Sequence, residues 1–99
     1  MDLRVVDNPE ELRYELWVGA TRAGFIEYRS EPGVILLVHT EVDPAFEGQG
    51  LGARLVTGTL NDLRARDVKL VALCPFVRAY LRRHREYADL VVRGGADPQ

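Results

Sequence analysis

The sequence has one cysteine, no long apolar run and almost no excess of either charge. Cys74 is the single cysteine among 99 residues, so the chain forms no internal disulfide and offers no thiolate cluster for zinc. Apolar runs such as Val34–Val38 are far shorter than the ~20 residues that span a bilayer. The acidic start of the chain has no apolar stretch of signal-peptide length. We therefore expect one small cytoplasmic domain that neither contacts a membrane nor binds a metal.

The formal net charge of -2 is unevenly distributed. Residues 1–50 carry 4 basic and 10 acidic side chains, whereas residues 51–99 carry 9 and 5. A net acidic chain is not expected to be a uniformly basic nucleic-acid binder. The basic excess peaks in residues 78–85. A local positive region of this kind favours a small anionic ligand, the alternative being a solvated helix face.

The first half of the chain is predicted to form strands. Leu12, Tyr14 and Leu16 alternate with charged or aromatic residues, a period of two that is typical of a half-buried strand. Further strands are predicted over residues 21–30 and 34–42, separated by the turn residues Pro32 and Gly33. The centre of the last strand is apolar on both sides, which predicts that helices cover both faces of the sheet.

The second half changes to helical spacing. Apolar residues over 51–66 recur with the period of an amphipathic helix. A short buried strand is predicted over residues 69–73, and Pro75 suits the first turn of a second helix. The side chains predicted to point inward from that helix are Phe76, Tyr80 and Leu81. This order predicts an α/β sandwich, a single domain over residues 2–93, with residues 94–99 as a flexible tail.

A glycine-rich segment links the two halves. Gly48, Gly50 and Gly52 lie between the last predicted strand and the first predicted helix. Alternate glycines let the backbone approach a ligand closely, and the free N–H groups of a helix N-terminus attract phosphate. The segment lacks the last glycine of a dinucleotide-binding G-x-G-x-x-G motif and the Gly-Lys-Ser/Thr of a P-loop. Neither of these nucleotide folds fits.

The segment Glu47–Gly52 resembles the coenzyme A pyrophosphate loop of the GNAT superfamily of N-acetyltransferases, written Gln/Arg-x-x-Gly-x-Gly/Ala. Over residues 11–91 the chain is similar to the small single-domain GNAT-like acetyltransferases. The other matching segments, in chain order, are Ile26–Tyr28, Leu37–Thr40, Leu73–Val77 and Tyr80–Tyr87. The resemblance implies a mixed, mostly antiparallel sheet with helices on both faces, lacking the usual first two helices. Glu47 departs from the motif, so its side chain is not expected to hold the pyrophosphate.

The resemblance also implies transfer of an acetyl group from acetyl-CoA to a primary amine by direct attack. The acceptor would be a small molecule or a protein lysine or N-terminus, and the protein a monomer or weak dimer with no nucleic-acid partner. The residues expected at the coenzyme A site are Thr40, Val42, Gly48, Gln49, Gly50, Leu51, Gly52, Ala53, Cys74, Phe76 and Tyr80. Candidates for the adenosine phosphate are Arg54, Arg78, Arg82 and Arg83.

Direct attack needs a group that accepts the amine proton. His39 and Glu41, at the end of the strand expected beside the cofactor, are the candidates, and histidine ordinarily titrates near neutral pH. The alternative for His39 is a strand-end histidine bonded to backbone. Cys74 precedes a predicted helix, a position that makes thiols more reactive, and so allows an acetyl-cysteine intermediate; otherwise it packs against the pantetheine arm. Tyr80 either bonds the leaving thiolate or fills the core.

Two other functions agree with parts of the sequence. A coenzyme A-binding module with little catalysis, acting as a sensor or partner subunit, would keep the same loop and fold. Nucleic-acid binding by the arginine-rich last helix is disfavoured, because no aromatic residues suited to base stacking are interleaved with basic ones on a strand surface.

Overall fold

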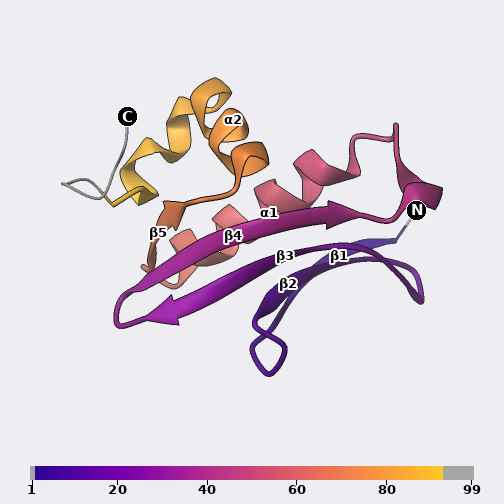
Figure 1. Cartoon of the computed structure of the whole chain (residues 1–99), viewed down its shortest axis with the longest axis horizontal. Helices are drawn as coiled ribbons and strands as arrows, with labels where there is room; N and C mark the ends of the chain where they lie inside the picture. Colours follow the sequence, from indigo (N-terminus) through magenta and orange to yellow (C-terminus); the bar gives the residue numbers. More distant parts are fainter. Residues whose placement is uncertain (1, 93–99) are drawn as a thin grey trace.

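The protein, described over residues 2–92 by a computed structural model, contains one five-stranded sheet (Figure 1). The strands lie in chain order, and each neighbouring pair is antiparallel except the last, which is parallel. Their bounds are β1 Leu3–Asn8, β2 Arg13–Val18, β3 Thr21–Glu31, β4 Val34–Val42 and β5 Lys69–Ala72. The predicted mixed, mostly antiparallel sheet is confirmed. The tail predicted over residues 94–99 lies outside the described residues.

Two α-helices and two short 3-10 helices complete the described fold. α1 (Leu51–Ala65) connects β4 to β5, and α2 (Pro75–Arg83) follows β5. The 3-10 helices are η1 (Pro44–Phe46) and η2 (Arg85–Leu90). A turn over residues 9–12 joins β1 directly to β2, so the connection holds no helix, as predicted. Within residues 2–92 no helix has the length and apolar character needed to cross a membrane.

Both helices cover the same face of the sheet, which we call the inner face. The buried side chains that point from it into the core include Tyr14, Leu16, Ile26 and Leu37. α1 packs across β1 to β5 on this side, behind the sheet in Figure 1. α2 lies on the same side, because Cys74 at its start contacts Thr40, the β4 residue paired with inward-facing Ile26.

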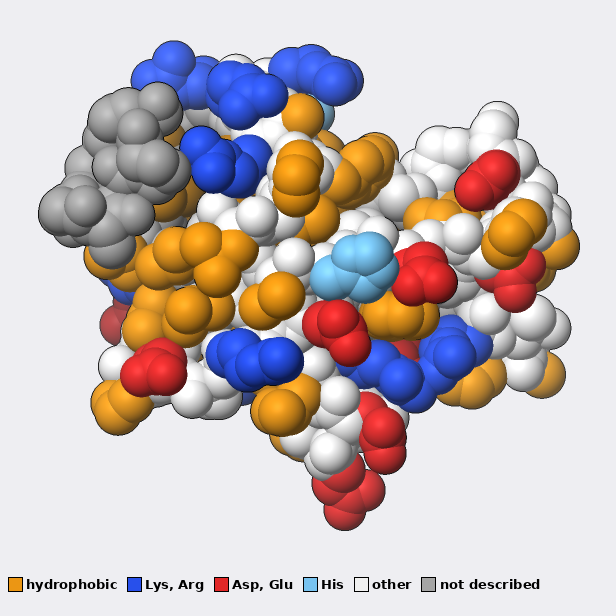
Figure 2. All heavy atoms as spheres, in the orientation of Figure 1, with side chains coloured by type: hydrophobic (Ala, Val, Ile, Leu, Met, Phe, Trp, Pro, Cys, Tyr) orange, Lys and Arg blue, Asp and Glu red, His pale blue; other side chains and the backbone are white. Residues whose placement is uncertain are grey.

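The prediction that helices cover both faces is wrong for the described residues. The opposite face, the outer face, carries the exposed side chains of Glu27, His39 and Glu41. Figure 2 views the molecule from this face, where charged side chains of both signs and a histidine lie open to solvent. Alternate side chains of the apolar run Val34–Val38 are buried on the inner face and only half-buried on the outer face. Such a strand needs no helix over its outer side.

α1 forms as its apolar spacing predicts, and in α2 Tyr80 and Leu81 pack against the core as predicted, whereas the prediction for Phe76 is wrong. The predicted inward residues of α1 are all buried: Leu51, Leu55, Val56, Leu60 and Leu63. In α2 it is Val77 that is buried, while Tyr80 and Leu81 are half-buried. Phe76 was predicted to face the core, but it is exposed and lies against Gly52 at the start of α1. The ring of Phe76 thus occupies the space beside Gly52 instead of a position in the core.

β1 is not predicted by the sequence pattern because its few apolar residues lie in an acidic segment at the sheet edge. β1 instead forms through its pairing with β2 and its packing against α1. Val5 points inward and lies so close to Gly58 that any side chain there would overlap it. A glycine in the middle of α1 therefore allows the edge strand to approach the helix.

A polar cluster ties the end of α1 to the sheet. The Tyr14 hydroxyl donates to Asp62, and the Tyr28 hydroxyl donates to Asp7. Arg66 bridges the two carboxylates, at 3.0 Å from Asp7 and 2.9 Å from Asp62. Burial, together with these hydrogen bonds to carboxylates, raises the pKa of both tyrosines far above the ordinary value. Both hydroxyls stay protonated and remain donors throughout the physiological range.

We expect Gly58→Ala to destabilise the fold, although alanine normally favours a helix over glycine by roughly 0.5–1 kcal/mol. A Cβ at residue 58 would lie 2.5 Å from Cγ2 and 2.7 Å from Cβ of Val5, so β1 must move away from α1, at about 1–3 kcal/mol. Urea unfolding of Gly58→Ala, Val5→Ala and the double variant measures this contact. The double variant should be more stable than the sum of the single effects predicts; strict additivity would contradict the contact.

Candidate functional site

The glycine-rich segment forms an exposed turn at the start of α1. Gly48 and Gly50 have φ angles of 82° and 72°, and nothing lies within 4 Å of where a Cβ would be. Gly50 is the N-cap of α1 and its carbonyl accepts from the Arg54 amide. The amides of the first turn therefore have no partner within the helix and point out of its positive end. This turn has the free donors and the open space that a phosphate group requires.

β4 and β5 separate just before α2, whose Phe76 lies against Gly52 of this turn. Their parallel pairing ends at Leu37 and Ala72, while β4 continues to Val42. The Leu37 carbonyl accepts from both following amides, Leu73 at 2.9 Å and Cys74 at 3.1 Å. Beyond this point β4 pairs with β3 on one side and with no described strand on the other. An extended ligand can therefore lie along the free edge of β4.

The inner side of this edge carries the candidate thiol. Cys74 is 4% exposed, and its Sγ donates to the Thr40 hydroxyl at 3.3 Å. Tyr80, six residues further along α2, shares a hydrogen bond with the Thr57 hydroxyl on α1 and stacks on His84 at 4.0 Å between ring centres. Thr57 was not among the residues predicted for the site, and a single threonine in an amphipathic helix gives no sequence signal for it.

The outer side of the same edge carries the candidate bases. His39 is 53% exposed, and its Nε2 lies 3.1 Å from Glu41 Oε1. Successive strand residues point to opposite faces, so His39 and Glu41 lie on the outer face while Thr40 points inward. The structure thus brings Cys74 to Thr40 and His39 to Glu41, and it places the two pairs on opposite faces of β4.

The predicted arginines lie on α1 and α2. Arg54 is exposed on the first turn of α1, and Arg82 and Arg83 are exposed on the last turn of α2. Basic side chains gather over α2 along the top of the surface in Figure 2. None of these, nor Arg78, forms an ion pair with a described residue, whereas Arg64 on the far end of α1 is held by Asp89 at 2.9 Å.

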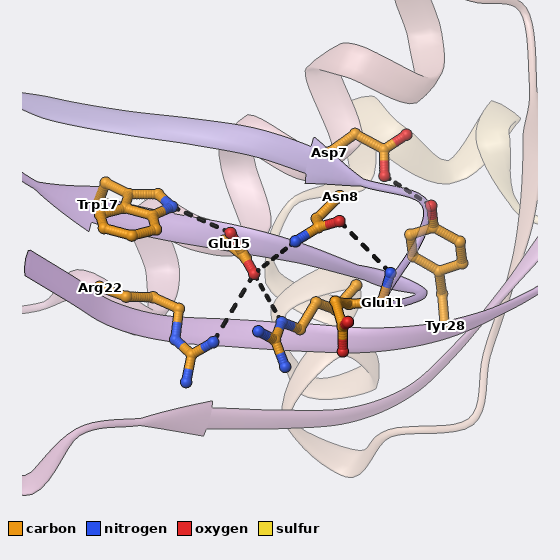
Figure 3. Close-up of polar contacts among 8 residues, drawn as sticks. Asp7, Asn8, Glu11, Glu15, Trp17, Arg22 and Tyr28 are labelled. Carbon is orange, nitrogen blue, oxygen red and sulfur yellow. Dashed lines mark hydrogen bonds and ion pairs between the residues drawn. The ribbon is translucent and has the colours of Figure 1, made fainter.

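A further polar cluster on the outer face was missed by sequence reasoning. Glu15 is 6% exposed and lies among side chains from three strands (Figure 3). Its partners, with their distances to the carboxylate, are Arg13 at 2.7 Å, Asn8 at 3.1 Å, Trp17 at 3.1 Å and Arg22 at 3.7 Å. Burial alone would raise the pKa of Glu15, but the hydrogen bonds from Arg13, Asn8 and Trp17 outweigh it and lower the pKa. Strand alternation places these residues on one face, yet gives no sign that one of them is buried.

Glu15→Gln is expected to lower the free energy of unfolding by about 1–2 kcal/mol at neutral pH, because a neutral amide replaces a carboxylate that accepts charge-assisted hydrogen bonds. The folded-state pKa of Glu15 is depressed. Its stabilisation is therefore complete above the ordinary glutamate pKa and is lost as the pH falls through the folded value. Chemical denaturation across acidic pH should show the wild type and the variant converging.

Glu27→Gln is the matched control, because Glu27 is an exposed glutamate on the neighbouring strand. It should change the free energy of unfolding little at any pH. A difference between wild type and Glu15→Gln that stays constant through the acid range would contradict the electrostatic account.

Metal chemistry has no obvious site in the described part of the chain. Within residues 2–92 no three His, Cys, Asp or Glu side chains come close enough to share an ion.

Comparisons with known proteins agree with the fold. A sequence profile of the GCN5-related N-acetyl-transferase family matches residues 13–90. A GCN5-like protein from Staphylococcus aureus, solved by NMR, superposes with a TM-score of 0.68 and 22% identity, over 98% of this chain and 95% of that chain. The ribosomal-protein-alanine N-acetyltransferase of Brucella melitensis biovar Abortus 2308 superposes with a TM-score of 0.54 and 18% identity, over 88% of this chain and 65% of that one. No curated protein matches the sequence.

Proposed function

Because the chain belongs to the GCN5-related N-acetyltransferase family, we propose that it moves the acetyl group of acetyl-CoA to a primary amine by direct attack. Acetyl transfer is the activity of the family; the donor, the acceptor and the residue roles are the proposal. The observation that carries it is the glycine-rich turn at the start of α1 together with the free edge of β4; α2 connects the two, because its Phe76 lies against Gly52. A turn with free amides and an open strand edge together suit a nucleotide thioester with a long arm.

In this proposal the first-turn amides of α1 hold the pyrophosphate of coenzyme A. Gly48 and Gly50 leave the space above these amides clear. Arg54, Arg78, Arg82 and Arg83, which form no ion pair with a described residue, are the candidates to supply positive charge for the adenosine phosphate, and at most two of them reach it. The pantetheine arm then follows the free edge of β4 past Thr40 and Val42 toward Cys74, with Phe76 beside the turn. The exposed side chain of Glu47 takes no part in this.

The acyl transfer itself needs a neutral amine next to the thioester and an acceptor for its proton. His39 is exposed on the outer face, and its Nε2 is hydrogen-bonded to Glu41. It can therefore take the proton from the amine and pass it to solvent. Cys74 lies on the inner face, buried and bonded to Thr40, where it packs beside the thiol end of the cofactor. The amine therefore approaches from the outer face, which no described helix covers, and no acetyl-cysteine is needed.

Gly50→Asp should weaken coenzyme A binding by tenfold or more, about 1.4 kcal/mol, because it adds a side chain and a negative charge where the pyrophosphate lies. Isothermal titration, and the upward shift of the melting temperature that coenzyme A causes by mass action, both measure this loss. Gly33→Asp is the matched control. Gly33 has a φ of 75°, close to the 72° of Gly50, equally open surroundings, and lies at the opposite end of β4.

Both aspartate variants should lose similar stability, since both force a side chain into the left-handed region. Only Gly50→Asp should lose affinity. Equal affinity in the two variants would mean that the glycine-rich segment is only a turn.

His39→Ala should lower kcat for acetyl transfer at neutral pH by at least tenfold while leaving coenzyme A affinity nearly intact. Cys74→Ala should bind coenzyme A somewhat more weakly and keep most of its turnover, because the thiol packs and does not attack. Steady-state kinetics with an amine panel and mass spectrometry of the acetyl-CoA-treated protein measure these outcomes. An acetyl adduct on Cys74 that passes to amine at the steady-state rate would overturn the direct mechanism.

A further inference from the structure

Two arginines on the outer face are held against one aromatic ring. The Cζ atoms of Arg13 on β2 and Arg22 on β3 lie 5.4 and 5.5 Å from the ring centre of Phe25. An aromatic face attracts a guanidinium, and the planar group stacks on it readily. The ring of Phe25 therefore brings two cations from neighbouring strands together on an open surface.

Glu15 fixes the same two guanidinium groups. It accepts from Arg13 Nε and lies 3.7 Å from Arg22 Nη1 (Figure 3). Two cations and one carboxylate leave one net positive charge. No described residue accepts a hydrogen bond from the Nη groups of Arg13 or from Arg22, whose side chain is 39% exposed. These N–H groups are oriented and available to a carboxylate or phosphate, which guanidinium groups bind in a fork.

The arginine pair and the candidate base His39 lie on the same face of the sheet. Arg13 pairs with Glu27, and Glu27 pairs with His39, so Arg13 and His39 are two strand spacings apart, about 10 Å. Phe25 lies between them, with its ring centre 6.3 Å from that of His39. Arg13, Glu27 and His39 thus form a row across three strands, with positive charge at one end and the candidate base at the other.

We propose that the acceptor amine of this enzyme carries an anionic group, a carboxylate or phosphate, about 10 Å from the reacting nitrogen, and that the Arg13–Arg22 pair binds it. This inference rests on the proposed acetyl transfer, with His39 taking the proton on the outer face. The exposed carboxylates of Glu27 and Glu41 attract the arriving ammonium group while the arginines receive the anion. A long zwitterion matches both ends of the row, whereas a simple alkylamine matches only one.

The test compares two acceptors of equal length that differ in the anion. The acetylation of ω-aminooctanoate and of octylamine is measured as kcat/KM for the wild type, Arg22→Gln and Arg29→Gln. The wild type should prefer ω-aminooctanoate by at least tenfold, and Arg22→Gln should lose most of that preference through KM. Arg29→Gln is the matched control, because Arg29 is an exposed arginine of β3 whose side chain bonds only the neighbouring Tyr28 carbonyl. It should keep the preference.

An ω-aminoalkylphosphonate of the same length, compared with ω-aminooctanoate, distinguishes a phosphate site from a carboxylate site. β-Alanine is too short to reach from His39 to the arginine pair, so it should react no better than an uncharged short amine. Equal kcat/KM for the two long acceptors in the wild type, or a preference that survives in Arg22→Gln, would overturn the inference; the guanidinium pair would then only cover the sheet. If neither amine is acetylated while coenzyme A still binds, the proposed reaction fails instead. NMR titration with ω-aminooctanoate then decides the anion site, which requires binding to the wild type and its loss in Arg22→Gln.

Discussion

The Leu37 carbonyl marks the point at which β5 separates from β4. It accepts from the amides of both Leu73 and Cys74, so the chain leaves β4 at that point and turns into α2. Pro75 at the first position of α2 has no N–H to satisfy and starts the helix at once. The free edge of β4, the position of Cys74 beside Thr40 and the placement of α2 next to the glycine-rich turn all depend on this one shared acceptor.

A free strand edge has two faces, and the chain uses them differently. The inner face is closed by α1 and α2 and holds a buried thiol bonded to a hydroxyl. The outer face is open and holds an exposed imidazole bonded to a carboxylate. Because strand residues alternate, this separation follows from the order His39, Thr40, Glu41 alone. A thioester lying along the edge would be sheltered on the side of its sulfur and reachable on the side of its carbonyl.

Local signals in spacing, proline and glycine predicted the strands β2 to β5, the helices α1 and α2 and the glycine-rich turn. The remaining features depend on contacts between distant residues. β1 needs Gly58 to let it approach α1. The exposure of Phe76 follows from the space beside Gly52, and the burial of Glu15 from partners on three strands. Helices were predicted on both faces because an apolar strand centre was equated with full burial, whereas the outer side is only half-buried. The glycine-rich turn has a local signal in its glycine spacing, whereas the Glu15 cluster on the outer face has none.

No helix of residues 2–92 covers the outer face, so its apolar side chains need another cover from water. Phe25 and Trp17 would expose apolar rings there, and the chain covers them with its own arginines: Arg4 over Trp17, and Arg13 and Arg22 over Phe25. The carboxylate of Glu15 holds Arg13 and Arg22 in place. Hydrogen bonds from Asn8 and Trp17 in turn fix the position of Glu15. Covering the rings in this way holds two cations on the same face as His39, with Arg13 two strand spacings from it. Because no helix of the described residues covers this face, the arginines that shield its rings are also the cations that the proposed acceptor site would use, and specificity for the acceptor is to be sought here.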